Sequence, residues 1–208
     1  MKKKLLAGLA VGVMMFGMTG VASANLLTNG SFENGTSAWG VVNWNGASTS
    51  VTNEKAFDGN SSIKTVHTQH SPYYYGGSWT SIGQDISGVL QPDTDYLLSF
   101  YYLTTSVDGF SFRISDPSRV MHSTPIVSVD PVADGNWHQV SQLFSFSAGA
   151  LAYEPILSFN YDYNVNVGST IYLDKISVDA APVPEPATML LMGTGLAGLI
   201  GARRKKKK

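Results

Sequence analysis

The middle of this chain alternates between inward and outward side chains over short stretches, which is the pattern of β-strands. Residues 96–103 carry aromatic and branched side chains over the length of one strand, and residues 170–178 have a similar composition. Two further stretches place large side chains on one face at every second position: Val140, Gln142, Phe144 and Phe146 in the first, and Leu157, Phe159, Tyr161 and Tyr163 in the second.

Turn-forming clusters separate these stretches, among them DGN twice, QPDTD, DPS and NVGS. Many short strands spaced by such turns, without a helical stripe or an internal repeat, predict an all-β sandwich or barrel.

The first 24 residues have a different character from this β-rich region. Three lysines at positions 2–4 precede an apolar run, and the run ends in Ala22-Ser23-Ala24. This order is typical of a secretory signal peptide, so residues 1–24 are expected to be removed by cleavage between Ala24 and Asn25. The body of the protein is then exported.

The other end of the chain is a short apolar segment with a basic terminus. Residues 187–202 carry no charge, and the six residues 203–208 are all Arg or Lys. A helix over 187–202 would span about 24 Å, less than the ~30 Å hydrocarbon core of a bilayer. The positive-inside rule keeps the basic terminus cytoplasmic. The segment also contains G-x-G-x-x-G, but too few residues follow for a nucleotide-binding unit.

Pro184, Glu185 and Pro186 precede this apolar segment, and the three parts together resemble a PEP-CTERM sorting signal of Gram-negative bacteria. The resemblance implies that residues 182–208 are recognised and processed by exosortase, an integral membrane protease or transpeptidase. It also implies a transient inner-membrane anchor, followed by location at the cell surface or in the extracellular matrix. The two prolines fit an extended and accessible segment.

Between the two ends, residues 25–181 are expected to form one domain. This part carries five basic and 14 acidic residues, a formal charge of −9, which argues against nucleic acid and anionic lipid as partners. The chain has no cysteine, so a disulfide framework, a thiolate metal site and a cysteine nucleophile are all excluded. No motif of a hydrolase, a P-loop or a zinc protease is present, and we expect a protein that is not an enzyme.

Several segments of the domain resemble carbohydrate-binding modules of the cellulase and xylanase type. They are NLLTNGSFENG at 25–35, SIGQDISGVLQPDTDYLLSFYY at 81–102, NWHQVSQLFSF at 136–146 and IYLDKISV at 171–178. The resemblance implies a galactose-binding-like jelly roll of two antiparallel sheets. The sequence departs from the pattern at Lys175, where a second acid is frequent.

The same resemblance implies a structural calcium ion that joins the N-terminal segment to the last strand. Its ligands would be Glu33 and Asp174, and the turn at Asp58 and Gly59 could add oxygen atoms. The alternative is that Glu33 and Asp174 only accept hydrogen bonds that cap turns. His67 and His70 are expected to be solvated loop residues.

Glycan binding requires flat aromatic faces beside polar groups, and the chain offers several aromatic side chains for this purpose. The candidates are Tyr73, Tyr74, Tyr75, Trp79, Tyr161 and Tyr163. Trp39 and Trp137 are expected in the core. Three functions follow as hypotheses: a binding module associated with extracellular polysaccharide or biofilm matrix, a structural or self-assembling matrix protein, and, least favoured, a glycoside hydrolase.

Overall fold

The computed structural model describes residues 24–44, 46–68, 79–115, 124–146, 156–161 and 166–181. This part of the chain contains strands β1 Gly40–Trp44, β2 Ala47–Thr52, β3 Ser62–His67, β4 Trp79–Asp85, β5 Tyr96–Thr104, β6 Phe110–Ser115, β7 Thr124–Val129, β8 Trp137–Phe144, β9 Ile156–Tyr161 and β10 Thr170–Ala180. The expected signal peptide and C-terminal anchor lie outside the described residues. Within them, no helix is long and apolar enough to cross a membrane.

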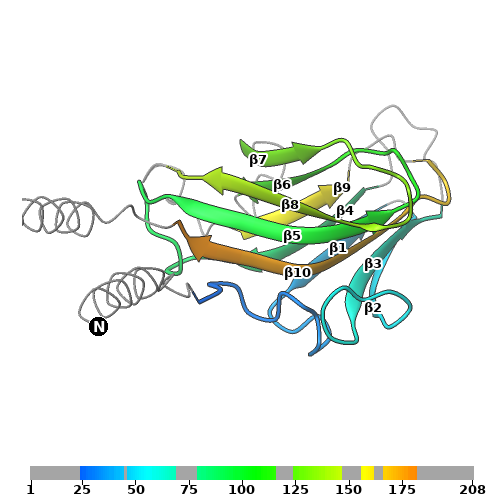
Figure 1. Cartoon of the computed structure of the whole chain (residues 1–208), viewed down its shortest axis with the longest axis horizontal. Coiled ribbons are helices and arrows are strands. Elements are labelled where there is room, and N and C mark those ends of the chain that lie inside the picture. Colours follow the sequence, from blue (N-terminus) through cyan, green and yellow to red (C-terminus); the bar gives the residue numbers. More distant parts are fainter. Residues whose placement is uncertain are drawn as a thin grey trace, which may run out of the picture. The chain divides into compact units, whose positions relative to one another are not determined.

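The strands form two antiparallel sheets that face each other (Figure 1). One sheet has the order β1-β4-β9-β6-β7, and the other has the order β2-β3-β10-β5-β8. Neighbours in each sheet are mostly far apart in sequence, because the chain crosses repeatedly from one sheet to the other. This arrangement confirms the predicted all-β jelly-roll sandwich, and β5 and β10 confirm the strands expected at 96–103 and 170–178.

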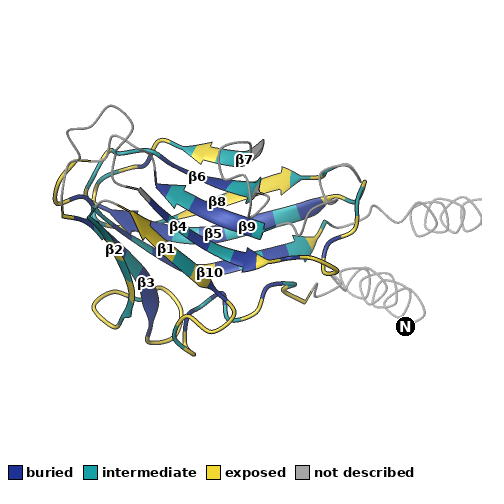
Figure 2. Ribbon diagram, turned by 180° about the vertical axis from the view of Figure 1, so that it is seen from behind, coloured by how far each residue is buried: buried dark blue, intermediate teal, exposed yellow. Residues whose placement is uncertain are grey.

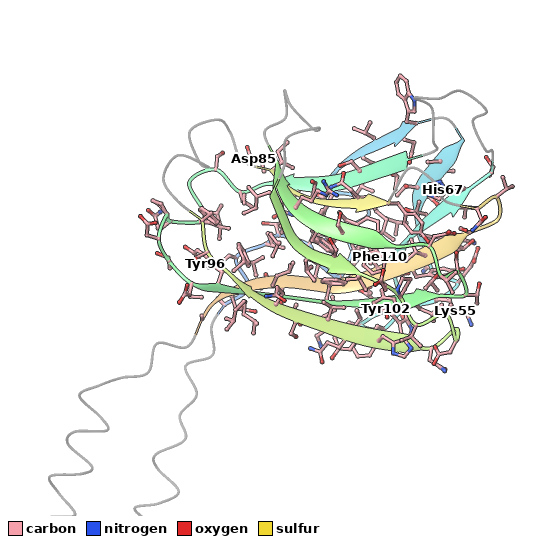
Figure 3. The ribbon with its side chains drawn as sticks, turned by 90° about the horizontal axis from the view of Figure 1, so that it is seen from above. Lys55, His67, Asp85, Tyr96, Tyr102 and Phe110 are labelled. Atoms are coloured by element: carbon pink, nitrogen blue, oxygen red, sulfur yellow. The ribbon has the colours of Figure 1, made fainter. Side chains whose placement is uncertain are left out.

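Aromatic side chains from both sheets fill the space between the layers. Phe110 and Phe112 of β6 point toward β5, where Phe100 lies 4.5 Å from Phe112 and Tyr102 lies 5.2 Å from Phe110, measured between ring centroids. Figure 3 shows Phe110 and Tyr102 in the interior, and Figure 2 shows buried residues along β6 and β9. Burial of such large rings is the main source of stability in a domain without disulfides.

The N-terminal segment is fastened to the last strand by hydrogen bonds. Leu26 N donates to Val178 O at 2.8 Å, and Ile176 N donates to Gly30 O at 2.9 Å. A Cβ atom added to Gly30 would lie 1.9 Å from Ile176 O, so only glycine permits this approach. The segment therefore follows β10 closely before the chain enters β1.

Of the two tryptophans expected in the core, only Trp39 is buried. Its Nε1 donates to Thr28 O and Asn29 O, both at 3.1 Å, which ties it to the N-terminal segment. Trp137 lies partly exposed at the start of β8, where its ring meets the edge of Phe57. The expectation for Trp137 was wrong because β8 is an edge strand.

A polar cluster occupies one end of the sandwich around His67 and Asp108. His67 is fully buried at the end of β3, 4.8 Å from Tyr161 between ring centroids, so the expectation of a solvated loop residue was wrong. Asp108 accepts a short hydrogen bond from the Ser169 hydroxyl and another from the Asn166 side chain at 2.8 Å. Burial lowers the pKa of His67, although the negative charge of Asp108 opposes part of this effect. The imidazole is therefore held neutral inside the domain.

We expect the neutral state of His67 to make the domain less stable in mild acid. The unfolded chain takes up a proton on this imidazole near pH 6.5, whereas the folded domain does so only at lower pH. The free energy of unfolding should therefore fall as the pH decreases below about 6.5, by at most about 1.4 kcal/mol per pH unit. Urea titrations at pH 7.5 and 5.5 would measure the loss, and His67→Asn should reduce it. An unchanged pH dependence in this variant would contradict the assignment.

Candidate functional site

The outward face of the β1-β4-β9-β6-β7 sheet carries polar side chains where the inward face carries the aromatic core. Because Phe110 and Phe112 point inward, Ser111 and Arg113 of the same strand point outward. In β9 the same rule sends Ser158 and Asn160 outward and leaves Leu157, Phe159 and Tyr161 inside. We call this surface the open face.

The strand register aligns the outward residues into two rows across the open face. One row contains Val42, Ser81, Asn160, Ser111 and Ser128. The neighbouring row contains Gly40, Gly83, Ser158 and Arg113. The second row has nothing larger than serine until Arg113, and a Cβ atom added to Gly83 would lie 2.6 Å from Ile156 Cγ2. Three strand spacings of ~4.8 Å give this low floor a width of about 14 Å.

Hydrogen bonds hold the larger polar side chains against this floor. Arg113 Nε donates to Ser111 Oγ at 2.8 Å, and Asn160 Nδ2 donates to Ser158 Oγ at 3.0 Å. Ser111 and Ser158 are almost completely buried, although both lie on the outward side of the sheet. No described residue bonds to the side-chain carbonyl of Asn160 or to the terminal nitrogens of Arg113, which could serve as an acceptor and as donors for a ligand.

An aromatic side chain borders the open face at the end of β1. Trp44 is 53% exposed, and its backbone pairs directly with that of Trp79 at the start of β4. An indole of this exposure presents a flat apolar surface beside the polar floor. The open face can therefore contact both the C–H surface and the hydroxyl groups of a ligand.

The aromatic residues predicted from the sequence for glycan binding fall into three groups. Tyr73, Tyr74, Tyr75 and Tyr163 lie outside the described residues, so their role stays a prediction. Trp79 begins β4, at the edge of the open face.

Tyr161 contradicts the prediction, because its side chain is 1% exposed and lies in the core. Its ring packs 6.1 Å from Phe159 and 4.8 Å from His67, measured between centroids, and burial raises the pKa of its hydroxyl. Leu157, Phe159 and Tyr161 do share one face as predicted, but this face is the interior of the sandwich.

Sequence reasoning missed Ser111, Arg113 and Asn160. The signal was present in the alternation of residues 110–115, FSFRIS, where three apolar residues alternate with Ser, Arg and Ser. The partner strand β9 shows the matching alternation of Ser158 and Asn160.

Two of the residues predicted as calcium ligands accept hydrogen bonds from the turn at residues 57–61. Asp174 Oδ2 accepts from Phe57 N at 2.7 Å and from Asp58 N at 2.9 Å, and Asp174 Oδ1 accepts from Lys175 N at 2.6 Å. Glu33 Oε1 accepts from Asn60 N at 2.9 Å and from Ser61 N at 2.7 Å. We call this arrangement the carboxylate latch.

The predicted calcium ion stays a prediction, because main-chain carbonyls and water can complete a calcium site beside two carboxylates. The described residues contain no group of three or more acids, histidines or cysteines that could hold a metal ion. Asp58 Oδ2 faces Lys175 Nζ at 3.8 Å, and a Cβ atom added to Gly59 would lie 2.6 Å from Glu33 Oε1. Burial raises the pKa of Asp174, although its three main-chain donors offset part of this effect. The hydrogen bonds that the alternative requires are present, and calcium binding by the same carboxylates stays a prediction.

Comparisons with known proteins agree with both parts of the sequence. Residues 24–154 match the CBM4/9 family, described as a carbohydrate binding domain, and residues 182–205 match the PEP-CTERM protein-sorting motif. No curated protein matches the chain at a significant level.

Several solved structures have the same fold. The CBM22-1 xylan-binding domain of Paenibacillus barcinonensis Xyn10C is 17% identical with a TM-score of 0.55, and the match covers 78% of this chain and 97% of that one. TmCBM61, solved with β-1,4-galactotriose, is 15% identical with a TM-score of 0.53 and coverages of 76% and 99%. The CBM22-1-GH10 modules of Clostridium thermocellum Xyn10B, complexed with xylohexaose, are 14% identical with a TM-score of 0.55 and coverages of 76% and 29%.

The latch leads to a test that separates hydrogen bonding from calcium binding. Asp174→Asn should lower the free energy of unfolding by about 1–3 kcal/mol, because a buried main-chain N–H loses its acceptor. Asp58→Asn is the matched control and should change little, since its carboxylate meets only an exposed lysine. Excess EDTA separates the two alternatives, because a latch held by hydrogen bonds alone should keep its thermal midpoint. A midpoint that falls with EDTA and recovers with calcium alone would instead establish the predicted ion.

Proposed function

Because this chain belongs to the CBM4/9 carbohydrate-binding domain family and carries a PEP-CTERM sorting motif, we propose that it is an exported, non-catalytic module that binds extracellular polysaccharide through the open face. The observation that carries the proposal is the low floor of Gly and Ser bordered by Trp44, Asn160 and Arg113. The fold that the chain shares with a xylan-binding domain and a galactotriose-bound domain supports a saccharide ligand.

The chemistry of the open face suits a sugar chain better than a compact apolar ligand. A pyranose ring presents C–H groups on its faces and hydroxyl groups on its rim, which match the exposed indole of Trp44 and the amide of Asn160. The floor is about 14 Å wide and lies across several strands, so it suits an extended chain more than a single sugar.

The same face gives no support for hydrolysis. Glycosidases use two carboxyl groups that flank the scissile bond about 5–10 Å apart. Among the described residues of the open face, Asp85 at the end of β4 is the only carboxylate, and hydrogen bonding to Ser87 lowers its pKa. A carboxylate that is easily ionised is a poor proton donor to a leaving group.

Sorting by exosortase would place this module outside the cell and in contact with its ligand. We propose that the signal peptide directs export, that the C-terminal segment holds the protein temporarily in the inner membrane, and that processing then releases the domain to the extracellular polysaccharide or biofilm matrix. The acidic composition of the domain, with a formal charge of −9, keeps it soluble and limits nonspecific binding to nucleic acid.

Substitution of the open face should weaken polysaccharide binding without unfolding the domain. We expect Trp44→Ala and Asn160→Ala each to weaken binding about tenfold, because each removes one class of contact. Affinity electrophoresis on xylan, β-1,4-galactan and the extracellular polysaccharide of the producing organism would measure the change. Gln139→Ala on the opposite sheet is the control and should bind like the wild type.

Two outcomes would overturn this function. Absence of retardation on every polysaccharide, together with self-association that grows with concentration, would favour a structural matrix protein. Release of reducing sugar by the purified protein would establish a hydrolase instead.

The processed protein is expected to begin at Asn25 and to lose the apolar segment and basic terminus. Both cuts leave the described fold intact, because the Asn25 side chain itself bonds to Ile176 O and Val178 N, and Ala181 N makes the last hydrogen bond, to Asp95 O. Intact-mass measurement of the secreted protein would test this. Glu185→Ala should leave the full-length chain in the membrane fraction, and normal processing of this variant in the native host would contradict the sorting proposal.

A further inference from the structure

Arg113 is a partly buried charged residue, and no acidic side chain among the described residues pairs with it. Among the described residues it makes one side-chain hydrogen bond, from Nε to Ser111 Oγ, and no ion pair. In contrast, Lys64 Nζ lies 2.6 Å from Glu54 Oε2, and Lys175 Nζ lies 3.8 Å from Asp58 Oδ2. Within the described part of the domain, Arg113 is therefore left without an acidic partner.

The residues beside Arg113 in its row have short side chains. Across the sheet its neighbours in the same row are Ser158, Gly83 and Gly40, none of which has a side chain longer than serine. The bond from Nε fixes the side chain along its own strand toward Ser111. The two terminal nitrogens remain, and they form the planar fork that binds a carboxylate through two parallel hydrogen bonds.

We infer that Arg113 makes the open face selective for a polysaccharide that bears carboxylate groups, an inference that rests on the proposed function. A carboxylate on a uronic acid or on an acidic substituent would supply the counter-charge that no described residue provides. A neutral hydroxyl would accept hydrogen bonds from the same N–H donors but would leave the positive charge of Arg113 unbalanced. We therefore expect the open face to bind an acidic polysaccharide more tightly than its neutral counterpart.

The charge of the whole domain restricts the ligand further. At a formal charge of −9 the surface repels a dense polyanion, whereas a single carboxylate that reaches Arg113 is screened from most other charges over about 8 Å at physiological salt. The ligand class is therefore a largely neutral polysaccharide with sparse acidic residues.

The inference can be tested with matched polysaccharides that differ only in their carboxyl groups. Affinity electrophoresis of the purified secreted protein would compare glucuronoxylan with the same polymer after carboxyl reduction, and would treat the extracellular polysaccharide of the producing organism in the same way. We expect about tenfold weaker binding to the reduced forms. Polygalacturonate, a dense polyanion, should bind more weakly than glucuronoxylan.

Two variants test whether the preference for carboxylated polymers comes from Arg113 or from the net charge of the domain. Arg113→Gln should bind the native and the reduced polymers equally, at the affinity that the wild type has for the reduced form. Lys55→Gln makes the same change in charge at an exposed loop position and should keep the wild-type preference. Retention of the preference in Arg113→Gln would overturn the assignment.

The outcomes separate this inference from the proposed function. Equal binding of the wild type to native and reduced polymers would overturn the selectivity and leave polysaccharide binding in place. Failure to bind any of these polymers would overturn both.

Discussion

The opposite orientation of successive side chains along each strand is the constraint on which the rest of this structure depends. In β6, Phe110 and Phe112 build the core while Ser111 and Arg113 build the open face. A shift of one residue in register would expose the phenylalanines and bury the arginine. The tight packing of the aromatic core therefore also positions the polar residues of the candidate site.

The alternation is interrupted in β10, at the point where the N-terminal segment joins the last strand. Ile171 and Leu173 point into the core from odd-numbered positions, whereas Ile176 and Val178 do so from even-numbered positions. The bulge between Asp174 and Ser177, with Lys175 at a φ of 50°, shifts the phase by one residue and lets both halves of β10 bury their apolar side chains.

Two segments that are distant in the sequence bind to β10 at this bulge. The N-terminal segment bonds to Ile176 and Val178, and the turn at 57–61 bonds to Asp174. These contacts join the two ends of the domain without a disulfide or a cysteine. A chain that begins at Asn25 and ends after Ala181 would keep all of these hydrogen bonds.

The sequence by itself determined the fold class, the C-terminal sorting motif and the family, because these depend on local order: strand-length alternation, and Pro184-Glu185-Pro186 before an apolar segment. The charged and apolar leader predicts a signal peptide, which lies outside the described residues. The sequence also placed Leu157, Phe159 and Tyr161 on one face. Only the tertiary structure decided which face is the interior, since period-two alternation specifies two faces and not which of them meets the second sheet. This is why Tyr161 is a core residue, why Arg113 and Asn160 reach the open face, and why Glu33 and Asp174 meet a turn through hydrogen bonds.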